Sequence, residues 1–456
     1  MKLSPSDASA LLSESPSTPM HTGVLCLFAL PKGAEPDYLA RRFATMSAVA
    51  ELREPFNMVL KRQRLPVDLP GWTESDSHEF RHHFRHLALP WPHGDNELAG
   101  LISDLHTMPL RQDRPLWECT LIEGLKGNRF ALYFKTHQAL LEMGDTLEEV
   151  CRWMSPVRGK KGRAIPWGML LPMTTQVSKR GPVSLLFSAY GQALEQVKTV
   201  PGLTRALTRL ATQAVKRNPQ ATLPYSAPNS ILNTDISPQR RVMIISLEKS
   251  RLSALAKRHK VSLSEVVLAL IGGGLGSYLN KNKALPAKPL IARSEIKLKI
   301  PAEKGQKAIE QSLPVLVNLA THEQDALQRL LTIRDSLRDS TQALAKMNPA
   351  GMQSYSNMLM WPYHLIKLAG VSGRLRPMFN LVVSEYERQL KPLYAVDELL
   401  LGLYPIATLA DGHAAHIGYR SYAESVDLCV TVCPDSLPDI EQVKLAVQKE
   451  LRRLEQ

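Results

Sequence analysis

The feature that most constrains the fold is a basic tract near the middle of the chain, from Arg158 to Arg217. It holds eleven Lys or Arg residues and one acid, Glu195, so it carries about +10 of a net charge of +13. A chain of 456 residues is too long for one ordinary core and suits two domains of roughly 150–200 residues with a connector between them. We predict an N-terminal domain over 1–157, a helical connector and crossing loop over 158–239, and a C-terminal domain over 240–456.

The charge of the basic tract is compatible with three kinds of surface. It is a solvated face, or it attracts an anionic partner such as a membrane, a lipid-droplet surface or the phosphates of coenzyme A, or it binds nucleic acid. We disfavour nucleic acid because the tract has few aromatic residues for base stacking and contains no recognisable nucleic-acid module. Apolar residues at helical spacing predict a basic amphipathic helix, lying on the protein itself or on a membrane. These residues are Leu203, Leu207, Leu210 and Ala214.

Both flanking parts have the alternating strand and helix patterns of mixed α/β domains. In the first part, Phe130–Phe134 is continuously apolar, as in a strand covered on both faces, and it leads directly into His137 and Gln138. Asp145 is predicted as the N-cap of the helix that follows. The predicted strands are Gly23–Leu30, Trp117–Ile122, Arg129–Lys135, Val242–Leu247, Leu313–Leu319, Met378–Ser384, Ala414–Tyr422 and Asp427–Cys433.

A helix over Leu263–Asn280 is predicted by a capping box of Ser262 and Glu265. Four glycines lie inside this helix, and each costs about 0.5–1 kcal/mol relative to alanine. We therefore expect the helix backbone to pack closely against a neighbouring element. The glycines are Gly272, Gly273, Gly274 and Gly276.

Composition narrows the class of protein. No stretch of about 18 apolar residues appears, so no transmembrane helix is predicted, and the polar start of the chain, Met1–Ser17, lacks the features of a secretion signal. A cytoplasmic location is the resulting expectation. Five scattered cysteines without a CxxC pair predict neither a disulfide framework nor a metal site.

Several short segments, in order along the chain, resemble signatures of the bacterial bifunctional wax ester synthase/diacylglycerol acyltransferase family. Each is weak alone, but together, at suitable spacing, they are specific. They are Pro19-Met20-His21-Thr22-Gly23, Pro55-Phe56-Asn57, His82-His83-Phe84-Arg85-His86, Pro115-Leu116-Trp117, Asn318-Leu319-Ala320-Thr321-His322, Phe379-Asn380-Leu381-Val382-Val383-Ser384 and Leu403-Tyr404-Pro405-Ile406.

The resemblance implies a fold and a reaction. The fold is α/β, with two domains like those of coenzyme A-dependent (chloramphenicol acetyltransferase-like) acyltransferases joined by a helical connector. The reaction transfers an acyl group from acyl-coenzyme A, a substrate and not a cofactor, to a long-chain alcohol or to diacylglycerol. No cofactor is implied.

The family's HHxxxDG motif aligns with a changed stretch of this chain. The first histidine is His137, but the second is replaced by Gln138, the aspartate by Glu142 and the glycine by Met143. A neutral imidazole can take the proton of an attacking alcohol, whereas an amide cannot. The resemblance marks further motif positions: Pro115, Leu116, Trp117, Ser264, Glu265 and Asn380. Ser264 and Glu265 replace an Asn-Asp pair, although capping explains Glu265 by itself.

Three groups are candidates to replace the lost base. His137 is one, although neighbouring residues at a strand end usually point to opposite sides. Glu142 is another, and His413 or His416 from the second half is the third. The family's Pro- and Gly-containing turn is also lost, because Glu385–Gln389 holds neither residue, so that turn must be built differently.

Three hypotheses about the function remain open. The chain is an O-acyltransferase with weakened or lost catalysis, or it is a non-catalytic homologue that binds lipid or acyl-coenzyme A, or regulates a partner, at a membrane or lipid-droplet surface. A peripheral membrane role of the basic tract alone is a third hypothesis.

Overall fold

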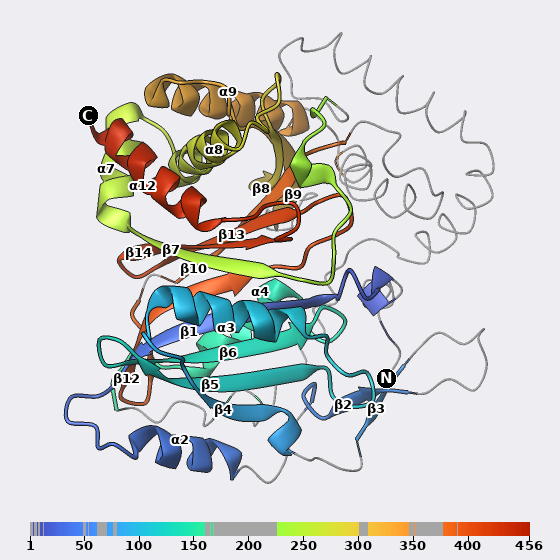
Figure 1. The fold of residues 1–456 in the computed structure, drawn as a ribbon, viewed down its shortest axis with the longest axis vertical. Helices are drawn as coiled ribbons and strands as arrows, with labels where there is room; N and C mark the ends of the chain where they lie inside the picture. The colour runs from blue at the N-terminus through green and yellow to red at the C-terminus, as the bar shows by residue number, and fades with distance from the viewer. Residues whose placement is uncertain are drawn as a thin grey trace.

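The computed structural model describes residues 3–167 and 226–456, apart from 4–6, 8–9, 12, 49–51, 53, 62–70, 76–79, 160–164 and 166 in the first part and 301–308, 346–351, 353–376 and 390 in the second. Nearly all of the basic tract, and the amphipathic helix predicted within it, lie outside these residues. Two six-stranded sheets lie one above the other (Figure 1).

The first sheet has the strand order β11-β12-β1-β6-β5-β4. Helices α2 (Tyr38–Ser47) and α4 (Met143–Trp153) pack on one face, where the continuously apolar strand β6 contributes Phe130, Leu132 and Phe134 to the core. Helix α3 (Asp95–Thr107) packs on the other face. The strands from the first half of the chain are β1 (His21–Ala29), β4 (Phe84–Ala88), β5 (Trp117–Leu125) and β6 (Arg129–His137), and a separate ribbon pairs β2 (Met58–Leu60) with β3 (Trp72–Glu74).

Two strands of the first sheet come from the far end of the chain. Strand β12 (Glu398–Ile406) pairs antiparallel with β1, and β11 (Tyr394–Ala395) pairs with β12 at the edge. Gly23 is the register partner of Ile406. The predicted domain over 240–456 thus supplies two strands to the sheet of the first half, an exchange that the predicted boundaries do not include.

The second sheet has the strand order β7-β14-β13-β10-β8-β9, with β10 parallel to both β13 and β8. One face is covered by α7 (Lys249–His259), α8 (Leu263–Lys281), α9 (Ala326–Ala345) and α12 (Glu441–Glu455). The short helix η3 (Ile231–Asn233) precedes the sheet. The strands are β7 (Arg241–Glu248), β8 (Ile291–Ile300), β9 (Ile309–Asn318), β10 (Leu381–Gln389), β13 (Ala415–Tyr422) and β14 (Ser425–Val432).

The region between the two sheets, here called the seam, is filled by α3 and by one face of β12. Apolar side chains from both sheets form one continuous cluster there, with Ile102 of α3, Val242 of β7 and Tyr404 of β12 among its members. A polar contact also crosses the seam, because the buried carboxylate of Asp427 on β14 accepts a hydrogen bond from the Leu403 N–H of β12 at 2.9 Å. The two halves therefore share a core.

Helix α8 is the central buried helix of the second half. A Cβ on Gly272 or Gly276 would clash with the carbonyl oxygens of Leu319 and Thr321, and one on Gly274 would lie 2.6 Å from Val447. The predicted close backbone packing is therefore confirmed. Among the described residues, α8 is the one helix long and apolar enough to cross a membrane, and 78% of that apolar window is buried inside the protein, as in a core helix.

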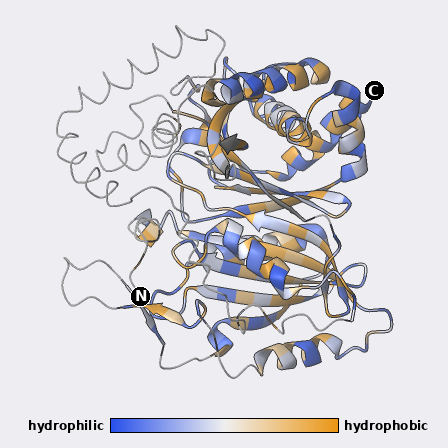
Figure 2. Cartoon of the chain, turned by 180° about the vertical axis from the view of Figure 1, so that it is seen from behind, coloured by the Kyte–Doolittle hydropathy of each residue, from blue (hydrophilic) through white to orange (hydrophobic). Residues whose placement is uncertain are grey.

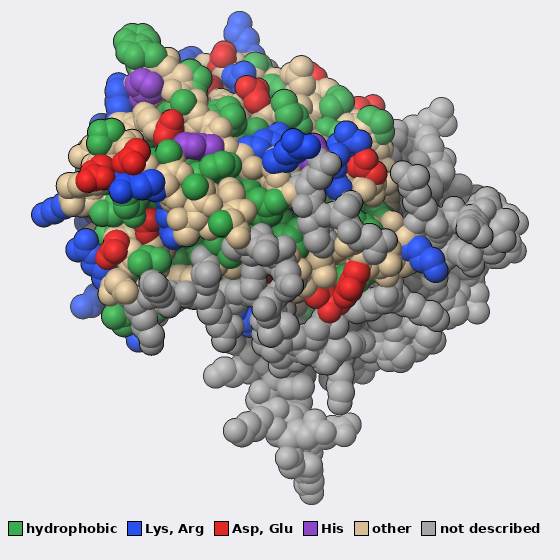
Figure 3. All heavy atoms as spheres, turned by 90° about the horizontal axis from the view of Figure 1, so that it is seen from below, with side chains coloured by type: hydrophobic (Ala, Val, Ile, Leu, Met, Phe, Trp, Pro, Cys, Tyr) green, Lys and Arg blue, Asp and Glu red, His purple; other side chains and the backbone are tan. Residues whose placement is uncertain are grey.

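The hydropathy of the elements matches this layering, since apolar residues concentrate on the strands and on the helix faces turned toward them (Figure 2). On the face shown in Figure 3, basic and acidic side chains of the described residues lie interspersed. The strong local excess of positive charge thus belongs to the sequence of the basic tract and not to this described face.

Most predicted elements are present, and two local predictions are wrong. Helix α4 begins at Met143 with Glu142 as N-cap, three residues before the predicted cap at Asp145. No tight turn is built over Glu385–Gln389, because β10 continues through Gln389 with an irregularity in its pairing to β13. Without the proline and glycine that would bend it, the chain stays extended.

Candidate active site at the seam

His137 and Gln138 lie where β6 ends, between the starts of β5 and β1. The His137 N–H donates to the Leu116 carbonyl at 3.0 Å, and the Gln138 N–H donates to the Met20 carbonyl at 2.9 Å. His21 of β1 is the cross-strand partner of His137. Backbone pairing on both sides therefore fixes the direction in which each side chain points.

The Pro115-Leu116-Trp117 motif forms the wall beside this strand end. Leu116 and Trp117 are fully buried, and the Trp117 indole N–H donates to the Phe56 carbonyl at 2.8 Å. The His83 ring stacks on the Trp117 ring with centroids 4.7 Å apart. These contacts hold β5 in place, so the motif acts on the site by positioning the strand next to His137.

His137 is buried, and the lone pair of one ring nitrogen already accepts a hydrogen bond. The Ala139 N–H donates to His137 Nδ1 at 3.0 Å, so the proton of the neutral ring is on Nε2. Glu14 Oε1 lies 3.5 Å from that Nε2. Burial alone would raise the pKa of the Glu14 carboxyl, but the neighbouring His137 lowers it. In this arrangement His137 offers no nitrogen to an alcohol as a base.

Gln138 is partly buried, and its amide bonds to the segment that follows β12. Its Nε2 donates to Thr408 Oγ1 at 2.8 Å, and the Thr408 hydroxyl donates in turn to the His21 carbonyl at 2.7 Å. Thr408 follows β12, so the glutamine is tied to the segment that the second half inserts. An amide so placed can hold a substrate oxygen by a hydrogen bond but cannot take its proton.

Glu142 has an exposed side chain and caps α4 through its backbone. Its carbonyl accepts from the N–H of Thr146 at 2.9 Å and from the Thr146 hydroxyl at 3.0 Å. Met143, at the position of the motif's glycine, is buried in the core of the first domain. These positions build the start of a helix, which is a structural role.

The motif residues of the second half also make structural contacts. Ser264 donates to Glu385 Oε2 at 2.5 Å, so two positions that depart from the family pattern face each other. Glu265 completes the predicted capping box with Ser262, which is confirmed. Asn380 is fully buried, and its side chain joins the start of β10 to the N–H of Ile291, the carbonyl of Pro228 and the side chain of Asn233.

Of the histidines proposed as replacements, His416 is connected to Gln138 through Thr408, to which both side chains bond. Its Nδ1 is 3.2 Å from the Thr408 carbonyl, and its Nε2 is 3.0 Å from Ser384 Oγ on β10. His413 instead faces the Phe379 carbonyl at 3.2 Å and stacks on the Phe379 ring. Sequence reasoning missed Ser384, since it appeared only as the last residue of the family-like segment Phe379–Ser384.

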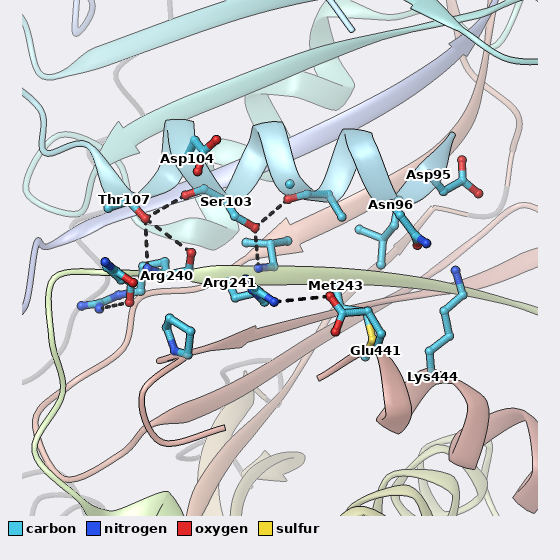
Figure 4. Close-up of a pocket in the computed structure, with 16 residues that line it drawn as sticks. Asp95, Asn96, Ser103, Asp104, Thr107, Arg240, Arg241, Met243, Glu441 and Lys444 are labelled. Atoms are coloured by element: carbon cyan, nitrogen blue, oxygen red, sulfur yellow. Dashed lines mark hydrogen bonds and ion pairs between the residues drawn. The ribbon is translucent and has the colours of Figure 1, made fainter. Parts of the chain in front are cut away.

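A pocket of about 450 Å³ opens elsewhere on the seam, between α3 and β7 (Figure 4). Its charged lining is largely self-paired, with Arg241 and Glu441 3.7 Å apart and Arg240 hydrogen-bonded to backbone carbonyls. Neither His137 nor Gln138 lines it. Among the described residues, no three His, Cys, Asp or Glu side chains gather as metal ligands would.

Two α/β domains that share a seam, with a motif at a strand end facing it, define the class of two-domain acyl-transfer and condensation folds. The first condensation domain of the calcium-dependent antibiotic synthetase shares this fold, with a TM-score of 0.51 and 13% identity over 99% of this chain and 94% of that chain.

The family follows from closer likenesses. The model of the wax ester synthase/diacylglycerol acyltransferase catalytic domain matches residues 3–267, and that of the WS/DGAT C-terminal domain matches residues 313–455. The O-acyltransferase WSD of Acinetobacter baylyi is 31% identical over 99% of this chain and 96% of its own length. The wax ester synthase/diacylglycerol acyltransferase of Marinobacter aquaeolei VT8 superposes with a TM-score of 0.78 at 28% identity, over 100% of this chain and 99% of that one. The chain belongs to this family of acyl-coenzyme A-dependent O-acyltransferases.

Proposed function

We propose that this protein transfers an acyl group from acyl-coenzyme A to a long-chain alcohol or to diacylglycerol, at a rate lowered by the loss of the motif's second histidine. The observation that carries the proposal is the place of Gln138. It stands at the strand end where the motif puts its base, and its amide donates to Thr408.

The chemistry sets the size of the expected loss. An alcohol is a poor nucleophile at pH 7 unless a base removes its proton during attack, and such a base is typically worth about 10²–10⁴-fold, or roughly 3–5 kcal/mol of barrier. Gln138 supplies only a hydrogen bond. Positioning of the two substrates still contributes, so slow turnover is expected.

A second candidate function is a non-catalytic homologue that binds acyl-coenzyme A or lipid. The specific observation that favours it is the state of His137, whose Nδ1 already accepts from Ala139 and whose Nε2 faces Glu14. The imidazole that the motif retains therefore brings no base to the strand end.

The basic tract from Arg158 to Arg217 supports a further part of the proposal, namely attachment of a cytoplasmic protein to an anionic membrane or lipid-droplet surface. Its charge of about +10 is the support. Liposome flotation at rising salt tests this part, because electrostatic attachment weakens as ionic strength rises. Binding that ignores both anionic lipid and salt would contradict it.

The catalytic proposal is tested with purified full-length protein, labelled palmitoyl-coenzyme A, and hexadecanol or diacylglycerol as acceptor. Matched variants are Gln138→Ala, which removes the positioning amide, and Gln138→His, which restores a titratable ring. We expect slow product formation by the natural chain, less by Gln138→Ala, and more by Gln138→His. If all three proteins bind palmitoyl-coenzyme A but form no product, the acyltransferase proposal is wrong and the non-catalytic candidate is favoured.

A further inference from the structure

Ser384 and His416 form a hydroxyl–imidazole pair on the face of the second sheet that is turned toward the seam. Ser384 lies on β10 and His416 on the neighbouring strand β13, with Ser384 Oγ 3.0 Å from His416 Nε2. Their neighbours in sequence, Val383 on β10 and Ile417 on β13, point the other way, into the helix-covered core. Sheet geometry thus directs both side chains to the same side.

The hydrogen-bond partners fix which nitrogen of His416 is basic. A carbonyl oxygen only accepts, so the Thr408 carbonyl, 3.2 Å from Nδ1, takes the Nδ1 proton. Nε2 therefore keeps its lone pair and accepts from the Ser384 hydroxyl. A nucleophile, a base within hydrogen-bond reach and a third group that orients the base make up the arrangement of activated serine sites.

The surroundings of the pair fit acyl transfer. Ser384 is 8% exposed, and His416 is half-buried. The guanidinium of Arg293 on the adjacent strand β8 lies 5.9 Å from the centroid of the Phe379 ring and near enough to His416 to lower its pKa. A cation whose charge acts on His416 is placed to stabilise negative charge that develops on a carbonyl oxygen beside the pair.

One residue joins this pair to the motif site. The Thr408 carbonyl orients His416, while the Thr408 hydroxyl is bonded to Gln138 Nε2 and to the His21 carbonyl. The glutamine that replaces the expected base and the imidazole that faces the Ser384 hydroxyl are thus held by the same residue. An acceptor held by Gln138 would therefore be separated from the His416 ring by one residue, Thr408.

We propose that Ser384 accepts the acyl group from acyl-coenzyme A, with His416 as its base, before the group passes to the alcohol; this inference rests on the proposed function. Ser384 Oγ attacks the thioester carbonyl as His416 Nε2 takes the hydroxyl proton. The carbon–sulfur bond then breaks, and the coenzyme A thiolate takes that proton, leaving a Ser384 ester and free coenzyme A. The acceptor alcohol attacks the ester, its proton passes through His416 to Ser384, and the ester product leaves.

The protonation state of His416 is compatible with this role. Burial, together with the charge of Arg293, lowers the pKa of His416 to about 4, and the bond to the Thr408 carbonyl offsets part of that shift. His413, which also faces this region, has its pKa lowered to about 3 by burial. Both rings are neutral at pH 7. A base with so low a pKa is weak, so a slow reaction is expected.

The test is acyl-enzyme trapping on the full-length protein. Radiolabelled palmitoyl-coenzyme A is added without acceptor, the protein is denatured, and bound label is located by peptide mass mapping. We expect label on the peptide that contains Ser384, stable to neutral hydroxylamine and released by alkaline hydroxylamine, as an oxygen ester behaves. Ser384→Ala should abolish the label, and His416→Gln should slow labelling about hundredfold or more.

Two further variants guard against misfolding and chance acylation. Ser294→Ala removes a buried serine of β8 that points to the opposite face from Arg293, and it should label normally. Ser384→Cys should move the label to a thioester that neutral hydroxylamine releases. Label on a native cysteine, or equal labelling of Ser384→Ala and the natural chain, would overturn the inference.

The outcomes separate this inference from the proposed function. Product formation with no acyl-enzyme, and with turnover unchanged in Ser384→Ala, overturns the serine ester and leaves the acyltransferase in place. Label on Ser384 that never reaches hexadecanol or diacylglycerol supports the pair and overturns the proposed acceptors. Neither label nor product overturns both.

Discussion

The two sheets each bring a histidine to the seam, and the two rings are used in opposite ways. His137, at the end of β6, accepts from the Ala139 N–H and turns its protonated nitrogen to Glu14. His416, on β13, gives its proton to a carbonyl and keeps its lone pair for a hydroxyl. The difference teaches that a histidine's role depends on which nitrogen its neighbours occupy, and not on the motif that contains it.

The comparison extends to the polar groups around each ring. On the first sheet, the ring of His21 bonds within its own half, to the His106 carbonyl at 2.7 Å, whereas Gln138 bonds to Thr408 of the inserted segment. Polar groups of the second sheet reach across to the inserted segment, as Asp427 does to Leu403 and His416 does to Thr408. The second sheet thus contacts the inserted segment through both a carboxylate and an imidazole, and three predictions test the comparison between the sheets.

The largest expected effect concerns Asp427, whose pKa burial raises from 3.8 to about 6. A raised folded-state pKa favours the protonated acid, so the contribution of this group to stability is complete below pH 3.8 and is lost as the pH rises through 6. The loss amounts to about 3 kcal/mol. Besides the Leu403 N–H, the hydroxyl of Ser246 on β7 donates to Asp427, at 2.7 Å. Asp427→Asn keeps the shape and can still bond both groups, so the variant should lack this pH dependence.

Urea unfolding of both proteins from pH 4.5 to 7.5 measures the effect. The free energy of unfolding of the natural chain should fall relative to that of Asp427→Asn as the pH rises. If the free energies of unfolding of the two proteins change with pH in parallel, ionising buried Asp427 has no effect on stability. The comparison between the sheets would then lose one of its two examples.

A smaller effect is expected at His137. His137→Ala leaves the buried Ala139 N–H without its acceptor, which should lower the free energy of unfolding by about 1–3 kcal/mol. Turnover per folded molecule should stay within a few-fold of the natural chain, because this ring offers no base. The two quantities are measured on one preparation by urea unfolding and by product formation. A hundredfold loss of turnover without loss of stability would reverse the roles assigned to the two histidines.

The smallest effect concerns Thr408, which connects the two sites. Thr408→Val removes the hydroxyl that joins Gln138 to the His21 carbonyl, and we expect a loss of about 1 kcal/mol in the free energy of unfolding. Thr408→Ser keeps the hydroxyl and serves as the matched control, with an unfolding midpoint near that of the natural chain. If both variants lose the same stability, the methyl packing of Thr408 matters and its bridge does not.

Local signals in the sequence predicted much of the fold. The apolar run of β6, the Ser262–Glu265 capping box and the close packing at Gly272 each depend on a few neighbouring residues, and the structure confirms all three. The start of α4 was misplaced because both Glu142 and Asp145 can serve as a cap, and packing of Met143 into the core decides between them.

The candidate site was only partly predictable. The strand end with His137 and Gln138 follows from the motif and the apolar strand before it. The pairing of Ser384 with His416 depends on β10 and β13 lying side by side in parallel, and the sequence carries no sign of which strands pair. The same holds for β12, whose sequence does not show that it pairs with β1 from the other half of the chain.

The insertion of β12 beside β1 has a consequence for biosynthesis. Strand β1 is synthesised long before its partner β12, since Gly23 pairs with Ile406. Until β12 has been made, one side of β1 must therefore wait unpaired, and an unpaired strand edge invites association with other chains. Pairing so distant in sequence also makes folding slow. A chain truncated before β12 should accumulate in inclusion bodies or bound to chaperones, however complete its first domain is in sequence.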